Sequence, residues 1–344
     1  MKSNQVVFRL TAAAMLCAGV STGYASGFGL MEESVPLMGT EYAGAAAKAD
    51  DASNEYYNAA QIVTVDKPTV SVGAVLLPFS TTIDSGVWHG YSDGPVTHYS
   101  TKSNNFIPDA HIVTPLSSSW FFSFGVTAPF GLKTEFPAEQ YSDYYGLPTQ
   151  TGITAINMNP SVAYAINSHW SVAAGFDAMQ GKANYDAQVG GGGLIKDSLS
   201  GWGYGYNLGV LYRLSTKTRF GLGYRSPVNL HAKGPSEQSD GDGVVRPNER
   251  SEADAILNLP DSYVASFFHQ IDSHWDVVGT AQFTRWSVEK NLIINHSQPQ
   301  ELPVINNLNY KDSWFYSLGA DYKLNQQWRL KMGLGYDQTP TQDG

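Results

Sequence analysis

The chain is poor in cysteine and in charge, and both shortages exclude classes of protein. Its 344 residues include one cysteine, so no disulfide framework can form within it. Only 15% of the residues are Asp, Glu, Lys or Arg, against about 25% in an average soluble domain. The 31 acidic residues outnumber the 21 basic ones, and no Lys/Arg stripe is present, which excludes a nucleic-acid-binding protein. The 12% of aromatic residues excludes a disordered chain.

The chain also lacks the long apolar runs of a helical membrane protein. Such a protein needs runs of roughly 18 apolar residues, and the mean hydropathy of this chain is -0.24. In contrast, Gly is frequent with 34 residues, and there are 20 Tyr and 8 Trp. An all-β protein remains, either soluble or a transmembrane β-barrel. A barrel places its apolar residues at every second position, so an average over the sequence does not detect them.

Residues 1–25 have the pattern of a signal peptide. Lys2 and Arg9 provide the positive start, an apolar stretch covers 10–20, and small residues precede a cleavage site after Ala25. The apolar stretch is too short for a membrane anchor. Removal of this segment would take away the only cysteine and two cations, leaving 19 − 31 = -12 charges. The Gly-x-Ser-x-Gly pattern at 19–23 lies in the discarded segment with no strand before it, so it does not indicate a hydrolase.

The remaining chain alternates between apolar and small or polar residues, which is the pattern of strands with two different faces. In one segment the apolar set is Trp202, Tyr204, Tyr206, Leu208, Val210 and Tyr212. The same pattern recurs in 314–322 and 328–336. A soluble sandwich also alternates, but it places its largest residues in the middle of each strand. Here Trp and Tyr lie at the strand ends with aliphatic residues between them, which favours a lipid-facing band bordered by aromatic girdles.

Eleven such segments can be counted, with alternating short and long connections. They are 68–80, 104–116, 119–130, 154–167, 169–186, 201–214, 218–230, 252–270, 274–286, 313–324 and 327–337. Long loops are expected at 81–103, 131–153, 187–200, 231–251 and 287–312. Short periplasmic turns and long extracellular loops are typical of an outer-membrane barrel. An odd number of strands would leave the barrel open, so the chain is expected to be truncated at its C-terminus, unless one strand was miscounted.

Residues 26–67 do not alternate and are rich in small residues. The segment is too short and too polar for a separate domain. We expect it to fill the lumen of the barrel as a plug, and the alternative is a periplasmic tail. The predicted organisation is therefore a signal peptide at 1–25, an N-terminal hatch at 26–67 and a transmembrane antiparallel β-barrel at 68–344 that is incomplete at its C-terminus.

Several short motifs, in order along the whole mature chain, point to a known family. They are 26–30 (SGFGL), 39–44 (GTEYAG), 49–53 (ADDAS), 128–135 (APFGLKTE), 157–164 (NMNPSVAY), 223–230 (GYRSPVNL), 259–262 (LPDS), 286–287 (WS) and 335–340 (GYDQTP). With these motifs the chain resembles the FadL-type transporters of long-chain fatty acids and hydrocarbons in Gram-negative outer membranes.

The resemblance implies a barrel of fourteen strands, of which about eleven are present here, and an N-terminal hatch in its lumen. It therefore agrees with a C-terminal truncation. Two departures from the family pattern stand out. The hatch motif Asn-Pro-Ala reads Asn58-Ala59-Ala60 here, so the turn fixed by proline is expected to be lost. The basic residue that the family places late in its fifth strand has no match, because Asp186-Ala187 stands there.

The resemblance also implies a passive mechanism of uptake. A long-chain fatty acid would be captured between outer loops and then bind in the lumen. After movement of the hatch, it would leave sideways through a gap in the third strand. The gap is carried over to Gly131, and Phe28 and Asn58 are carried over as hatch positions. Their alternatives are an ordinary strand end and ordinary plug packing.

Candidate ligand contacts follow from the residues themselves and from this resemblance. Arg225 and Lys331 lie on the lumen-facing phase and could hold a carboxylate head group. Lys133 belongs to the motif that follows the third strand. Tyr144 and Leu147, with Tyr141 and Tyr145, make the next loop amphipathic, as a capture groove requires. The alternatives are ion pairs of the two cations with Asp321 or Asp337, and packing of that loop on its neighbours.

The expected partners are hydrophobic ligands and the components of the outer membrane. They are a long-chain fatty acid or hydrocarbon, outer-membrane lipid and lipopolysaccharide, and the barrel assembly machinery during biogenesis; the protein is expected to be a monomer. No enzyme activity, cofactor or metal is expected, and no nucleic acid. Three alternatives stay open: a channel for aromatic hydrocarbons, a non-selective porin, and an outer-membrane lipid hydrolase, which would need a Ser/His pair that the sequence does not show.

Overall fold

The computed structural model describes residues 27–88, 94–135, 148–189, 193–239, 245, 250–297 and 303–341. The predicted signal peptide and the loop residues Tyr144 and Leu147 lie outside this part of the chain. The described N-terminal segment, residues 27–67, contains the short helix α1 (Val35–Met38) and the 3-10 helices η1 (Ala52–Tyr56) and η2 (Ala59–Thr64). None of the described helices has the length and apolar character needed to cross a membrane.

All strands of the described chain belong to one antiparallel sheet. The first six are long: β1 (Thr69–Trp88), β2 (Gly94–Pro115), β3 (Trp120–Glu135), β4 (Pro148–Ala165), β5 (Trp170–Val189) and β6 (Gly193–Arg213). The others are shorter: β7 (Thr218–Arg225), β8 (Val228–Ser239), β9 (Arg250–Leu259), β10 (Ser262–Gln270), β11 (Trp275–Thr284), β12 (Asn291–His296), β13 (Val304–Asn307), β14 (Ser313–Lys323) and β15 (Arg329–Asp337). A 3-10 turn, η6 (Trp286–Val288), follows β11.

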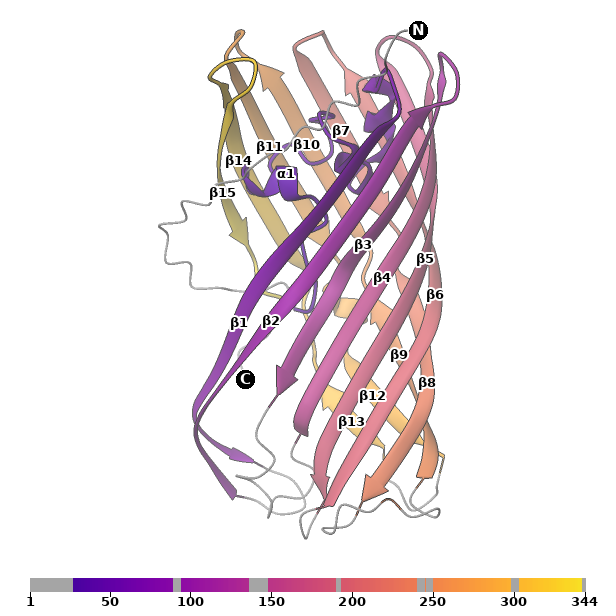
Figure 1. Cartoon of the computed structure of the whole chain (residues 1–344), viewed down its shortest axis with the longest axis vertical. Coiled ribbons are helices and arrows are strands. Elements are labelled where there is room, and N and C mark those ends of the chain that lie inside the picture. The colour runs from indigo at the N-terminus through magenta and orange to yellow at the C-terminus, as the bar shows by residue number, and fades with distance from the viewer. Residues whose placement is uncertain are drawn as a thin grey trace, which may run out of the picture.

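Eleven of these strands form one hydrogen-bonded path in the described chain, and they correspond to the eleven segments predicted from alternation. The order is β1-β2-β3-β4-β5-β6-β7-β10-β11-β14-β15, and the path curves into a barrel-shaped wall (Figure 1). β8, β9, β12 and β13 lie off the path as continuations of their neighbours beyond short interruptions. The two ends of the path are β1, which pairs with β2, and β15, which pairs with β14.

The long loops expected from the sequence are shorter than predicted, because the strands continue past the apolar alternation. The region 187–200 was expected to be a loop, but β5 reaches Val189 and β6 begins at Gly193. β1 and β2 likewise cover most of 81–103, and their paired residues run to Trp88↔Gly94. A membrane-crossing strand needs only about 9–11 residues, while β2 has 22. Strict alternation therefore ends before the strands do, and its loss marks the edge of the lipid band and not the end of the ladder.

The five short turns share one construction. In each, a side-chain oxygen accepts hydrogen bonds from the backbone N–H groups two and three residues later. The five acceptor residues are Ser117, Asn167, Ser215, Asp272 and Asn325. Ser, Asn and Asp favour such turns because their short side chains reach the backbone that follows. The prediction of tight turns at these five places is confirmed.

Aromatic residues border the outer face of the wall at two levels. Next to the short turns, Trp120 packs on Tyr164 and Trp170 packs on Tyr212, with ring centroids 4.7 and 4.5 Å apart. A second row crosses β6, β7, β10, β11 and β14; its members in order are Tyr206, Tyr224, Tyr263, Phe283, Trp314 and Tyr316. The aliphatic residues between the rows are exposed, as in Leu318 and Leu222. The predicted lipid-facing band with aromatic borders is therefore present.

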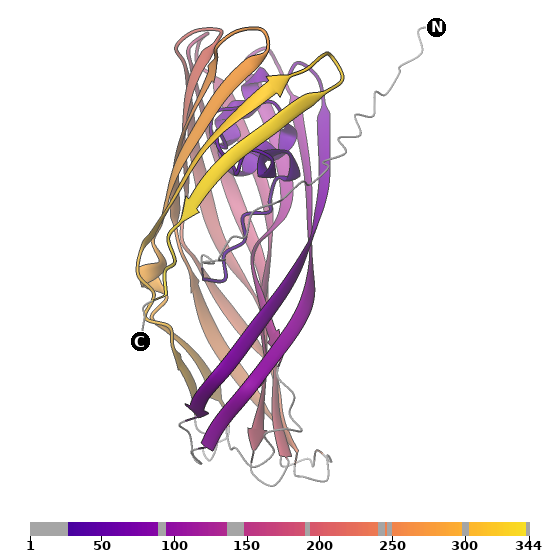
Figure 2. The ribbon, with the colours of Figure 1, turned by 90° about the vertical axis from the view of Figure 1, so that its left-hand side faces the viewer.

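The N-terminal segment lies inside the curve of the sheet, near the short turns (Figures 1 and 2). Glycines on the inner face allow its backbone to approach the strands very closely. A Cβ added at Gly221 would lie 1.7 Å from the carbonyl oxygen of Ala46, and one at Gly223 would lie 2.0 Å from that of Tyr57. Much of the inner face therefore packs closely against the N-terminal segment.

Candidate functional site

The main cavity of the described chain lies between the N-terminal segment and a part of the wall where strands are interrupted. β7 ends at Arg225 and β8 begins at Val228; β9 and β10 are separated at 260–261; β11 and β12 are separated by η6. Residues at these interruptions, Ser226, Pro260 and Trp286, line the cavity. Its empty volume is about 1010 Å³, including solvent at its mouth.

Arg225 forms the polar end of this cavity and is already engaged on both sides. Its Nη1 pairs with the carboxylate of Asp177, which is fully buried on β5. Its Nη2 donates to the carbonyl oxygen of Tyr56 at 2.7 Å, and the guanidinium lies 4.2 Å from the centroid of the Tyr56 ring. Asn157 donates to the same carboxylate at 2.7 Å and Asn207 at 3.3 Å. Arg225 therefore ties the wall to the N-terminal segment.

A buried carboxyl group, Glu33, lines the cavity from the N-terminal segment. Burial raises the pKa of Glu33 to about 8, because water no longer stabilises its charged form. The hydroxyl of Tyr57 lies 3.0 Å from Glu33 Oε2 and 2.9 Å from the carbonyl oxygen of Met31. The Tyr57 hydroxyl donates to Glu33 Oε2, which lowers the pKa of Glu33, but burial has the larger effect and the pKa stays raised.

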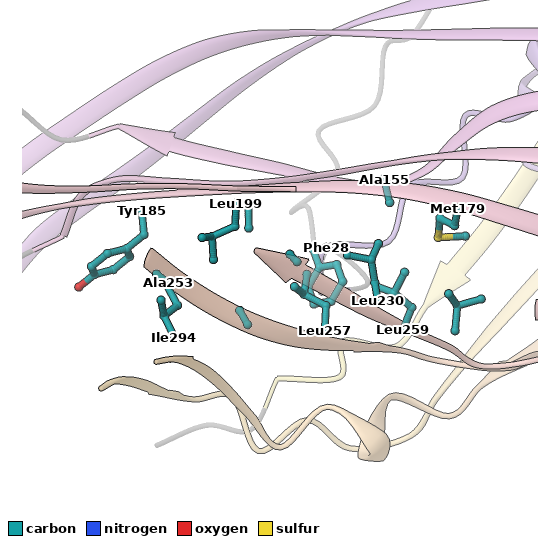
Figure 3. Packing of buried hydrophobic residues seen from close by; sticks show 14 of the residues in the cluster. Phe28, Ala155, Met179, Tyr185, Leu199, Leu230, Ala253, Leu257, Leu259 and Ile294 are labelled. Carbon is teal, nitrogen blue, oxygen red and sulfur yellow. The ribbon is translucent and has the colours of Figure 1, made fainter. Parts of the chain in front are cut away.

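The apolar end of the cavity is an aromatic cluster with Phe28 at its centre. The ring of Phe28 lies 5.1 Å from that of Trp286, 5.8 Å from Phe130 and 6.4 Å from Tyr310, measured between centroids. Phe28 also belongs to a larger buried cluster with aliphatic residues of β8 and β9, among them Leu230 and Leu257 (Figure 3). Residues from four separate parts of the chain therefore enclose one ring of the N-terminal segment.

The ladder between β2 and β3 stops beside this cluster. It runs from Pro115↔Phe121 to Ala110↔Val126, although both strands continue. β3 then has a bulge between Thr127 and Phe130 in its pairing with β4. The free edge of β3 is covered by the N-terminal segment: Leu30 N donates to Pro129 O and Gly131 N donates to Phe28 O, both at 2.9 Å. A Pro in this strand fits, since an edge position demands no N–H donor.

The rest of the N-terminal segment is held by buried charges. Lys48 Nζ lies 2.8 Å from Asp321 Oδ2, and both side chains are fully buried. Arg329 approaches Asp50 at 2.9 Å and Asp321 at 3.4 Å. Arg219 donates to the carbonyl oxygen of Lys48 at 2.6 Å. These contacts join the segment to β7, β14 and β15.

A second buried charge cluster lies under the start of η1. His111 Nδ1 is 2.9 Å from Glu55 Oε1, and His111 Nε2 is 3.4 Å from Asp109 Oδ1. Nε2 is also 3.1 Å from the carbonyl oxygen of Glu33. The described residues contain no group of three or more His, Cys, Asp or Glu arranged to hold a metal ion. The contacts of His111 with Glu55 and Glu33 attach the N-terminal segment to β2.

The structure brings together some of the predicted site residues and separates others. Arg225 and Asn58 line the cavity, and Phe28 and Gly131 lie at its apolar end. Lys331 is remote from the cavity lining and donates to the carbonyl oxygen of Pro36 at 2.6 Å. Lys133 pairs with Glu135 at the exposed end of β3. Arg225 pairs with Asp177, and not with Asp321 or Asp337 as the alternative suggested.

The turn at Asn58 forms without the proline of the family motif, which corrects the expectation. Asn58 is the N-cap of η2, and its Oδ1 accepts a hydrogen bond from Ala60 N at 3.0 Å. Its Nδ2 donates to the carbonyl oxygens of Ala46 at 2.8 Å and Val210 at 2.9 Å. Proline at the first helical position would only fix a conformation that the Asn cap already supports.

Sequence reasoning did not find Glu33, Asp177 or Trp286 as parts of the site. Asp177 stands on the lumen phase of the strand 169–186, after Ser171, Ala173 and Gly175, and this isolated charge was the available signal. Trp286 was noted only within a family motif. Glu33 gave no signal, because its burial depends on the packing of the segment against distant strands.

The sequence profile of the family described as "Outer membrane protein transport protein (OMPP1/FadL/TodX)" matches residues 16–344. The long-chain fatty acid transport protein of Escherichia coli is 28% identical over 386 residues, covering 98% of this chain and 83% of that protein. A 47 kDa outer membrane protein of Pasteurella multocida is 25% identical and covers 98% of this chain and 83% of its own length.

Solved structures show the same fold. A FadL homologue of Pseudomonas aeruginosa superposes with a TM-score of 0.78 at 19% identity, covering 92% of this chain and 82% of that one. The toluene transporter TbuX of Ralstonia pickettii superposes with a TM-score of 0.68 at 19% identity, covering 85% of this chain and 83% of that one.

Proposed function

Because the chain belongs to the OMPP1/FadL/TodX family of outer membrane transport proteins, we propose that it takes up long-chain fatty acids or similar hydrophobic molecules across the outer membrane. Outer-membrane localisation is shared with its named relatives, and the β-barrel fold of its solved neighbours is present here. The observation that carries the proposal is the cavity between the N-terminal segment and the wall, with an apolar and a polar end.

The N-terminal segment acts as the hatch in this proposal. It occupies the inside of the wall (Figure 2), and its first part covers the free edge of β3. Movement of Phe28–Leu30 away from that edge would leave β2 and β3 unpaired beyond Ala110↔Val126. An apolar ligand could then pass sideways from the cavity into the lipid, at the place where Gly131 was expected to mark a gap.

The transport is passive. Transfer of a fatty-acid chain from water into an apolar cavity is favourable by about 0.8 kcal/mol per methylene group. Transfer from the cavity to the lipid costs little, since both surroundings are apolar. The hatch then controls the rate at which the ligand leaves and does not drive transport. Enzymatic activity has no place in this scheme, and the cavity performs binding alone.

Aromatic hydrocarbons are a second candidate ligand class. The cage of Phe130, Trp286 and Tyr310 encloses the ring of Phe28, so it is already shaped for one aromatic ring. Edge-to-face contacts of this kind favour rings over aliphatic chains by about 0.5–1.5 kcal/mol. A relative with the same fold is named as a toluene transporter.

A reversible lock of the hatch tests the proposal. Gly29 and Phe130 form an isolated antiparallel bridge, and the flanking hydrogen bonds make it a pair whose Cα atoms come within disulfide reach. A Gly29→Cys/Phe130→Cys variant of the whole chain, in a host without its own fatty-acid transporter, should take up oleate only after reduction. The Phe130→Cys single variant is the control, because it loses the same ring without forming the bond.

The outcomes separate function from mechanism. Uptake of toluene without uptake of oleate by the unaltered chain would remove the fatty-acid assignment in favour of the hydrocarbon one. Equal oleate uptake by the oxidised and reduced double variant would contradict movement of the hatch. Uptake of neither compound would contradict the proposed function as a whole.

A further inference from the structure

Among the described residues that line the cavity, Arg225 is the one cation, and a buried carboxylate already neutralises it. Asp177 is fully buried and accepts from Arg225, Asn157 and Asn207. The guanidinium also donates to the Tyr56 carbonyl and covers the Tyr56 ring. These contacts with Asp177 and Tyr56 therefore fix the position of the guanidinium group.

The other charged residues of the described lining are acids. Glu33 contributes a carboxyl group from the N-terminal segment and Asp337 contributes one from the end of β15. The lining thus has no positive charge to offer to an anion, and it becomes more negative when Glu33 ionises.

We propose that the cavity binds its ligand in an uncharged form, as a neutral lipid-like molecule or a hydrocarbon, and that Arg225 positions the N-terminal segment and does not hold a carboxylate head group. This inference rests on the proposed function. A carboxylate in the cavity would have to stay unpaired, or take Arg225 away from Asp177. Either choice leaves a buried anion without its cation, which is strongly unfavourable.

A matched pair of ligands tests this inference directly. Oleate and oleyl alcohol have the same hydrocarbon chain and differ in the charge of one end. The tritiated compounds should be measured for equilibrium binding to the purified full chain in detergent at pH 8.5, where oleate is ionised. Oleyl alcohol should bind at least about tenfold more tightly, because it needs no counter-ion in the cavity.

Two variants separate the roles of Arg225. Asp177→Asn removes the internal carboxylate and frees the guanidinium, so the affinity for oleate should rise about tenfold or more while that for oleyl alcohol stays within about twofold. Arg225→Met/Asp177→Leu removes both charges of the pair, so it should change the affinities for both ligands by the same factor, since it loosens the N-terminal segment without removing a head-group contact or leaving a buried anion unpaired. The second variant keeps the test decisive if Asp177→Asn does not fold.

The contrary results are distinct. Equal or tighter binding of oleate by the unaltered chain, or a selective loss of oleate binding in Arg225→Met/Asp177→Leu, would overturn the inference while the transport function stands. Binding of neither ligand by the unaltered chain would overturn the inference and the proposed function together.

Discussion

The two parts of the N-terminal segment are held to the wall by different forces. Residues 27–34 are attached by one aromatic cluster, by two hydrogen bonds to the edge of β3 and by the carbonyl oxygen of Glu33, which lies 3.1 Å from His111 Nε2. Residues 35–67 are attached by buried ion pairs and by backbone contact with inner-face glycines. Apolar contacts and edge hydrogen bonds can form and break one at a time. A buried ion pair cannot separate without leaving an unpaired charge.

This difference indicates which part of the proposed hatch can move. The first part covers the place where β2 and β3 separate, and its attachment is made of small, separable contacts. The second part is fixed by ion pairs to β2, β14 and β15 and by a hydrogen bond to β7. The hatch is therefore expected to open by release of 27–34 while 35–67 stays in place.

The largest effect should follow from Lys48→Met. Asp321 would then be left buried with only the more distant Arg329, at a cost of roughly 3–5 kcal/mol to the docking of the segment. Hydrogen exchange of the backbone N–H groups in η1 and η2 should accelerate. Lys67→Met, at an exposed lysine of the same segment, is the control and should leave exchange unchanged.

A second variant sharpens this result. In Lys48→Met/Asp321→Leu both charges are absent, and much of the protection should return because no buried charge is left unpaired. Unchanged exchange in the Lys48→Met variant would mean that the ion pair does not anchor the second part, and the comparison between the two parts would fail.

Phe28→Ala should have a smaller and more local effect. It removes the ring at the centre of the aromatic cluster, at a cost of about 3 kcal/mol to the docking of 27–34. Exchange of the N–H of Leu30, which donates to Pro129 O, should accelerate by about 100-fold. Phe176→Ala, at an exposed phenylalanine of the outer face, provides the control. Equal acceleration in η1 and η2 would show that the segment moves as one body.

The wall of the protein could be predicted from its sequence because a strand between lipid and a polar interior alternates strictly. The alternation from Trp202 to Tyr212 predicted which side chains of β6 face outward and which part of the strand crosses the membrane. The extension of β5 and β6 to the hairpin at Val189↔Gly193 could not be predicted, since it depends on hydrogen bonds between polar strands that no periodicity marks.

The site was predictable only in part, for a similar reason. Family motifs indicated Phe28, Asn58 and Gly131, and the alternation of its strand placed Arg225 on the lumen-facing side. All four lie at or beside the cavity. The partner of Arg225 was not predictable, because Asp177 is 48 residues away and faces it only across β6. A charged residue on a lumen phase reveals its side of the wall but not whether another residue of the protein neutralises it.

The smallest expected effect is a pH dependence of the first part. The pKa of Glu33 is raised by burial from 4.5 to about 8, so the docked segment binds a proton that the undocked segment releases. Docking is therefore fully supported below pH 4.5 and weakens as the pH rises toward 8, by about 2 kcal/mol between pH 6 and pH 8. After correction for the intrinsic pH dependence of exchange, the protection of Leu30 N–H should fall over this range.

Burial also raises the pKa of Glu289, on the wall, to about 7, which acts in the same direction. Glu33→Gln separates the two groups, because it should abolish the change at Leu30 if Glu33 is its source. A pH dependence that persists in Glu33→Gln would assign the effect to another buried group, such as Glu289, and would remove Glu33 from the contacts that hold 27–34 in place.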